Sequence, residues 1–145
     1  MTADADTVRG EQRGPFQPAN KVLLDASALL AVLHSEAGAE VVEEALEEAA
    51  MSTVNWSEVY QRWVARGVDV GGLRADVEAL GLDILPFTVD DAEQAAELST
   101  ATRQLGLSLG DRACLALARR LALPALTADR AWLDLDIGVD IRTIR

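Results

Sequence analysis

The chain has 145 residues, half of them apolar, which is enough for a single domain with one sizeable core. Its 24 acidic residues outnumber 13 basic ones, and the net charge of -11 argues against nucleic-acid binding through a broad basic surface. One cysteine excludes an internal disulfide, and the longest apolar run, residues 28–33, is far shorter than the roughly 20 residues of a membrane span. Since no secretory signal is visible, we expect a cytoplasmic protein.

The first 20 residues differ in composition from the rest of the chain. They contain two prolines and two glycines but only two large apolar side chains, Val8 and Phe16. We therefore expect residues 1–20 to form a mobile N-terminal tail and residues 21–145 to form the domain. From residue 21, short apolar runs alternate with longer helical periodicities, which is typical of a parallel sheet covered by helices. The predicted fold class is α/β.

The predicted elements follow one another closely along the chain. Strands are expected at 21–24, 51–53, 83–86, 124–127 and 139–143. Helices are expected at 27–34, 39–50, 54–66, from the glycine pair at 71–72 to about residue 80, and at 90–104, 108–121 and 130–133. Pro86 cannot donate a ladder hydrogen bond, so we expect the strand at 83–86 to lie near an edge of the sheet.

Three of these helices carry apolar residues at helical spacing, which predicts faces packed on the core. In the helix at 39–50 these residues are Val42, Leu46 and Ala49. In the helix at 54–66 they are Trp56, Val59, Tyr60 and Trp63. In the helix at 108–121 they are Cys114, Leu117, Ala118 and Leu121.

Four carboxylates follow predicted strands or begin predicted helices. Asp25 and Asp129 come after the strands at 21–24 and 124–127, Glu58 lies one turn into the helix at 54–66, and Asp111 lies in the first turn of the helix at 108–121. Because ligands of open parallel sheets bind at the carboxyl ends of the strands, all four side chains can reach one rim.

Four carboxylates brought together repel one another, and a divalent cation removes that conflict. A site built from oxygen ligands, without His or Cys, suits Mg²⁺ or Mn²⁺ rather than zinc. Such ions promote phosphodiester hydrolysis by lowering the pKa of a bound water and by stabilising charge on the reacting oxygens.

Each acid also has a structural explanation. Asp25 and Asp129 are suited to cap the helices that follow them, and Ser108 with Asp111 has the spacing of a capping box. Glu58 with Arg62 has the spacing of a surface ion pair, worth roughly 0.3 to 0.5 kcal/mol. The joint placement of the four carboxylates favours a common site over four separate structural roles.

These four residues lie in segments that resemble the motifs of PIN domains. In chain order the segments are LLDASALL at 23–30, NWSE at 55–58, LGDRACLALA at 109–118 and LTADRAW at 126–132. Each is short, but all four occur in the family's order, and the resemblance covers about residues 21–145.

The resemblance implies a three-layer α/β/α sandwich with a mostly parallel central sheet. It also implies Mg²⁺ or Mn²⁺ held chiefly by Asp25 and Asp111, with Glu58 and Asp129 completing the site. Ser27 and Thr127 match positions where the family places hydroxyls beside the acids, so the resemblance implies that they support the site.

The compact single-domain length further resembles VapC-type toxins. That resemblance implies a metal-dependent endoribonuclease that cleaves cellular RNA, forms a homodimer, and is silenced by a cognate VapB-like antitoxin. The 20-residue tail departs from this pattern, because compact toxins of this type usually begin close to the first strand.

Several other residues are candidates for the site. Arg112 and Arg130 follow two of the acids, and we expect one of them to contact a substrate phosphate. Asp134 is interpreted as a solvated turn residue, and the alternative is that it joins the site. His34 lacks an evident nucleophile partner, and Trp132, directly after the fourth motif's acid, fits either a core position or a stacking role.

Two alternative functions remain open from the sequence. One is a catalytically inactive PIN-like module that only binds a protein partner, although a lost site would be expected to lack at least one of the four acids. The other is a phosphate- or nucleotide-handling α/β domain, which is disfavoured because no glycine-rich phosphate loop is present.

Overall fold

The computed structural model describes residues 20–145, which form a five-stranded parallel sheet flanked by six α-helices. The strands are β1 (Val22–Leu24), β2 (Ala49–Ser52), β3 (Asp83–Leu85), β4 (Ala125–Thr127) and β5 (Ile141–Thr143). The helices are α2 (Ala26–Leu33), α3 (Ala39–Ala45), α4 (Thr53–Ala65), α5 (Leu73–Ala79), α6 (Val89–Ala101) and α7 (Leu109–Leu121). Short 3-10 turns occupy Leu46–Glu48, Arg103–Leu105 and Arg130–Asp134.

The strand order is β3-β2-β1-β4-β5, and every neighbouring pair is parallel. The chain builds outward from β1 through β2 to β3, then crosses to the other side of β1 for β4 and β5. The order therefore reverses between β1 and β4, which is where open α/β sheets bind their ligands, beyond the carboxyl ends of the strands. The position of β3 at an edge confirms the expectation drawn from Pro86.

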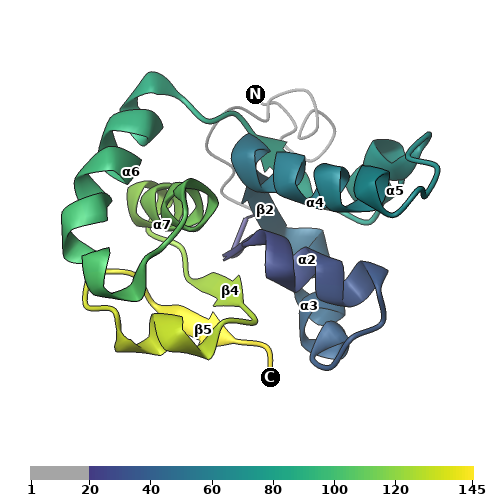
Figure 1. The fold of residues 1–145 in the computed structure, drawn as a ribbon. Helices are drawn as coiled ribbons and strands as arrows, with labels where there is room; N and C mark the ends of the chain where they lie inside the picture. Colours follow the sequence, from purple (N-terminus) through teal and green to yellow (C-terminus); the bar gives the residue numbers. More distant parts are fainter. Residues whose placement is uncertain (1–19) are drawn as a thin grey trace, which may run out of the picture.

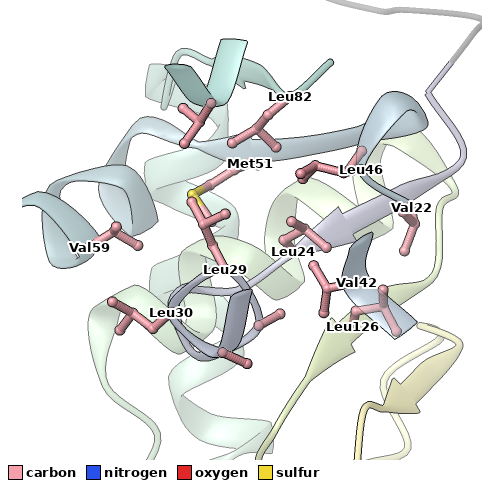
Figure 2. Packing of buried hydrophobic residues seen from close by; sticks show 14 of the residues in the cluster. Val22, Leu24, Leu29, Leu30, Val42, Leu46, Met51, Val59, Leu82 and Leu126 are labelled. Carbon is pink, nitrogen blue, oxygen red and sulfur yellow. The ribbon is translucent and has the colours of Figure 1, made fainter. Parts of the chain in front are cut away.

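Both faces of the sheet are covered, which gives the three layers visible in Figure 1. Strand side chains alternate between two cores, so that Leu24 and Met51 pack under α2 to α5, while Leu23 and Ala125 pack under α6 and α7. Figure 2 shows the first of these cores, where Leu29 and Val59 meet the strand residues. The predicted α/β/α sandwich is confirmed.

One predicted helix is shorter than the sequence suggested. The helix predicted at 39–50 ends at Ala45, and a 3-10 turn leads into β2, which begins at Ala49. Ala49 and Ala50 are both fully buried, one in each core, so they belong to a strand enclosed on both faces. The placement of Ala49 on a helical stripe is therefore wrong, because alanine fits either periodicity and carries little information of its own.

The stripe predicted on α4 is also only partly correct. Val59 is fully buried, and Trp56 and Trp63 pack partly buried against the first core, but Tyr60 is 38% exposed. The stripe predicted on α7 is confirmed, since all four of its residues are buried in the second core.

The predicted tail, residues 1–20, lies outside the described residues except for Asn20. This residue is buried, and its Nδ2 donates to Asp83 Oδ2 at 2.9 Å, at the start of β3. Within residues 20–145, no helix has the length and apolar character needed to cross a membrane.

An ion pair between Asp91 and Arg120 joins α6 to α7. Arg120 Nε donates to Asp91 Oδ1 at 2.7 Å, and its Nη2 donates to Oδ2 at 3.1 Å. Asp91 is 1% exposed and also closes the capping box of α6 with Thr88. Burial alone would raise the pKa of Asp91, but the hydrogen bonds from Arg120 and Thr88 outweigh it and hold the pKa below its usual value.

We expect Asp91→Asn to lower the free energy of unfolding by about 1.5 to 3 kcal/mol near neutral pH, as for other hydrogen bonds to charged groups. Because the folded-state pKa is lowered, this contribution is complete above the ordinary Asp pKa and is lost as the pH falls through the folded-state value. Urea unfolding of both chains across this range measures the difference.

The matched control is Asp140→Asn, since Asp140 also pairs with an arginine, Arg142, at 2.9 Å but is 61% exposed. Exposed pairs contribute roughly 0 to 1 kcal/mol, so this variant should differ little from the unaltered chain. Equal losses for the two variants, or a loss for Asp91→Asn that does not shrink in acid, would contradict the interpretation.

Candidate active site

Asp25 lies directly after β1, at the point where the strand order reverses. Its side chain caps α2, because Oδ1 accepts a hydrogen bond from Ala28 N at 2.9 Å and another from Ser27 Oγ at 2.7 Å. Oδ2 accepts a hydrogen bond from Thr127 Oγ1 at the end of β4. Asp25 is only 5% exposed, so these three donors hold a buried carboxylate in one orientation.

The same hydroxyls connect Asp25 to the loop after β4. Ser27 Oγ accepts a hydrogen bond from Ala128 N at 2.9 Å, and Thr127 Oγ1 accepts one from Asp129 N at 3.0 Å. Asp129 in turn caps the following 3-10 turn through a hydrogen bond from Ala131 N. The supporting positions of Ser27 and Thr127 therefore join the ends of two neighbouring strands into one network.

Glu58 is held by a close approach between α4 and α7. Asn55 Nδ2 donates to Glu58 Oε1 and to Gly110 O, both at 2.9 Å, and Asn55 is 1% exposed. A Cβ added at Gly110 would lie within 3.0 Å of all three carboxylate atoms of Glu58, so any other residue there would force this carboxylate to shift. Asn55 and Gly110 lie within the quoted motifs, but their roles were not recognised from the sequence.

Asp111 lies in the first turn of α7, next to Gly110, and completes a capping box. Its N–H donates to Ser108 Oγ at 3.1 Å, and its Oδ2 accepts from Ser108 N at 3.0 Å. The structural roles considered for Asp25, Asp111 and Asp129 are thus all present. They are compatible with a common site, because capping leaves each carboxylate at the start of a helix or turn at the same end of the sheet.

The four predicted carboxylates line one pocket of about 400 Å³. Glu36, in the turn after α2, is a fifth carboxylate in its wall, and Arg62 and Arg145 are its basic residues. In the turn that carries Glu36, Ser35 has a φ of 54°. No local sequence pattern predicts this left-handed conformation, so the position of Glu36 could not be predicted from the sequence. Asp134 is exposed and does not line this pocket.

Arg112 and Arg130, one of which we expected to contact a substrate phosphate, make their hydrogen bonds outside the pocket. Arg112 Nη1 donates to Ala95 O on α6 at 2.7 Å, and Arg130 Nη1 donates to Arg145 O at 3.0 Å. Neither lines the pocket. Trp132 is fully buried in the second core, where its Nε1 has no hydrogen-bond partner among residues 20–145, so it occupies a core position.

The remaining candidates also lie outside the pocket. His34 Nε2 accepts a hydrogen bond from Trp63 Nε1 at 3.0 Å, which ties α2 to α4. Cys114 is fully buried behind the site, and burial raises the pKa of its thiol well above the ordinary value. The charges of Asp25, Asp111 and Glu58 raise this pKa further, because all three carboxylates lie near the thiol.

Burial and mutual repulsion make the carboxylates costly to ionise together. Burial raises the pKa of Asp25 to about 6, despite the hydrogen bonds from Thr127, Ser27 and Ala28, and the charge of Asp111 adds to the rise. The pKa of Glu58 is raised by burial and by Asp111, against lowering effects from Asn55 and Arg62. A nearby cation would reverse these shifts.

The donor set of this pocket fits a hard divalent ion, since all its possible ligands are carboxylate or hydroxyl oxygens. Among residues 20–145, however, no three Asp, Glu, His or Cys side chains already lie close enough together to hold a metal ion. Holding an ion at this pocket would therefore require the carboxylates to move closer together.

The fold and the acidic pocket at its switch point define a class of α/β domain with carboxylates at the strand ends. A family model, the PIN domain, matches residues 22–138. The chain belongs to the PIN-domain family. A comparison of the sequence with curated proteins finds no match.

Several solved structures share this fold at low sequence identity. The VapC20 toxin of Mycobacterium tuberculosis, which cleaves the sarcin-ricin loop, is 18% identical over 83% of this chain and 99% of its own, with a TM-score of 0.66. A toxin-antitoxin complex from Klebsiella pneumoniae is 21% identical over 86% and 98%, with a TM-score of 0.66.

A third match is the VapBC2 complex of Rickettsia felis bound to a DNA fragment from its promoter. It is 15% identical over 84% of this chain and 97% of the matched chain, with a TM-score of 0.64. At these identities the matches establish the fold.

The raised pKa of Asp25 predicts how stability depends on pH. In EDTA, the free energy of unfolding should fall by up to about 3 kcal/mol as the pH rises from the ordinary Asp value to above 6, because the folded chain retains a proton that the unfolded chain has lost. Asp25→Asn should remove this part of the pH dependence.

Mn²⁺ should restore stability to the unaltered chain above about pH 6, and much less to Asp25→Asn, because the ion stabilises the ionised carboxylate. Thermal unfolding with Mn²⁺ and with EDTA measures both effects. Identical pH profiles for the two chains, or equal stabilisation by Mn²⁺, would show that Asp25 is not the group responsible.

Proposed function

We propose that this protein is a metal-dependent endoribonuclease, with Asp25, Glu58, Asp111 and Asp129 as its catalytic and metal-binding residues. The observation that carries the proposal is the convergence of these four side chains, from separate elements, on one pocket at the switch point of the sheet. Membership of the PIN-domain family supports the same conclusion, because the family's motifs contain these acids.

The residues of this chain have distinct parts in the proposed reaction. Asp25 and Asp111 would hold the ion, and Glu58 and Asp129 would complete the site and accept hydrogen bonds from the attacking water. Mg²⁺ or Mn²⁺ bound there would lower the pKa of that water and stabilise charge on the phosphate.

In the bond-breaking step, the water oxygen forms a bond to phosphorus while the bond from phosphorus to the leaving sugar oxygen breaks. A carboxylate takes up the proton of the water, and the leaving oxygen gains a proton from solvent. Ser27 and Thr127 act through Asp25, because their hydroxyls hold the orientation of its two oxygens.

We further propose that the domain at 21–145 acts as the toxin of a toxin-antitoxin pair, works in the cytoplasm and forms a homodimer. The similarity in fold to VapC20 and to the toxin-antitoxin complexes of Klebsiella and Rickettsia supports a cognate VapB-like antitoxin as its partner. The alternative of an inactive binding module is disfavoured by Asn55 and Gly110, because they hold the half-buried Glu58 carboxylate in an orientation that packing alone does not require.

The decisive experiment incubates the antitoxin-free chain with total RNA from its host in Mg²⁺, in Mn²⁺ and in EDTA, and maps cut sites by end sequencing. We expect discrete cleavage that EDTA abolishes. Asp25→Asn, Glu58→Gln, Asp111→Asn and Asp129→Asn should each lower the cleavage rate by at least about 100-fold, because each removes charge from the site.

Asp134→Asn and Asp136→Asn are matched controls, since both remove an exposed acid near the fourth motif that does not line the pocket. They should leave the cut pattern and the rate unchanged. A folded chain that binds Mn²⁺ calorimetrically but cuts no RNA would favour the binding-module alternative. A chain that binds no Mn²⁺ would refute the carboxylate site itself.

A further inference from the structure

Two arginines are the only basic side chains of the described residues in the wall of the carboxylate pocket. Arg62 comes from α4 and Arg145 from the segment after β5, and α2 separates these two parts of the chain in Figure 1. A strongly acidic pocket repels the phosphates of RNA, so binding requires positive charge where the strand enters and leaves. The chain carries a net charge of -11, so its overall charge does not attract the phosphates.

Arg145 is held in place by a tightly packed segment. The preceding residue, Ile144, is 4% exposed and lies so close to Gly38 that a Cβ there would overlap its backbone. Gly38 has a φ of +92°, which further disfavours any other residue. Arg145 Nη1 donates to Ala37 O at 2.7 Å, and its own carbonyl accepts from Arg130 Nη1.

This anchoring engages Nη1 and leaves Nε and Nη2 of the guanidinium without a hydrogen-bond partner among residues 20–145. Arg145 Nη1 lies 3.6 Å from Glu36 Oε1, and both side chains are about 40% exposed. Exposed pairs of this kind contribute roughly 0 to 1 kcal/mol, so a phosphate can replace Glu36 at little cost. A guanidinium also offers two parallel donors, the geometry that matches a phosphate.

Arg62 has a comparable position on the α4 wall. It lies one turn beyond Glu58 on the same helix and is close enough for its charge to lower the pKa of that carboxylate, against the larger effect of burial. Its side chain is exposed. It therefore presents a positive charge at the rim, next to the acids, without being buried in an ion pair.

Resting on the proposed nuclease function, we propose that Arg62 and Arg145 each bind one backbone phosphate of a single-stranded RNA, on either side of the phosphate to be cleaved. The strand then crosses the pocket from α4 toward the end of β5. This assignment replaces Arg112 and Arg130, because neither of them lines the pocket.

The test measures RNA binding separately from cleavage. A fluorescein-labelled single-stranded RNA of mixed sequence is titrated with the full chain in Ca²⁺, from about 50 to 200 mM salt, and a denaturing gel verifies that the RNA stays intact. The slope of log affinity against log salt reports the number of phosphate contacts, at about 0.7 per contact for single strands.

We expect Arg62→Gln and Arg145→Gln each to reduce the magnitude of this slope by about 0.7, and the double variant by about 1.4. Arg62→Lys and Arg145→Lys keep the charge, so they should retain the slope while binding more weakly. Arg119→Gln is the matched control, because Arg119 lies eight residues after Asp111 on α7, about 12 Å further along the helix. It should leave the slope unchanged.

The outcomes separate this inference from the proposed function. If the unaltered chain binds RNA but both Gln variants keep its slope, the two arginines are not phosphate ligands, and the inference is overturned while the nuclease proposal stands. If the unaltered chain binds no RNA, both are overturned. Slopes reduced by Arg119→Gln as much as by the pocket variants would mean diffuse attraction rather than two defined contacts.

Discussion

The burial of one carboxylate between two neighbouring strands is the constraint on which the site depends. Asp25 lies where β1 ends beside β4, and its charge is taken out of water at a cost that three hydrogen bonds only partly offset. The hydroxyls that supply two of those bonds also bind the backbone of the loop that carries Asp129. The hydrogen bonds around the buried Asp25 carboxylate thus fix the positions of both Asp25 and Asp129, although these two acids lie far apart in the sequence.

The second half of the site is built by helix packing on the sheet. Glu58 approaches α7 where Gly110 removes a side chain, and Asn55 fixes both partners with a single amide group. The Asp91–Arg120 pair on the far side of α7 ties that helix to α6. The helix α7, which carries Asp111 in its first turn, is therefore held from two sides. The distance between Glu58 and Asp111 thus depends on helix packing rather than on loop conformation.

The sequence could place the four acids at one end of the sheet because their positions follow from local rules. A residue directly after a buried strand, or in the first turn of a helix, must lie at the carboxyl end of a parallel sheet, so Asp25, Asp111 and Asp129 could be placed without coordinates. The basic residues could not be placed in this way. Arg145 reaches the pocket because Ile144 packs against Gly38. These two residues lie far apart in the sequence, so no local pattern predicts their contact.

The close approach of Gly110 to Glu58 has a consequence for how such a protein can change over evolution. A side chain at position 110 would need the space that the Glu58 carboxylate now fills, so that carboxylate would have to move away from Asn55. The constraint runs in one direction, because a shorter acid at position 58 would leave Gly110 without any overlap. Related chains that keep a long acid at this position of α4 should therefore also keep a small residue at the start of α7.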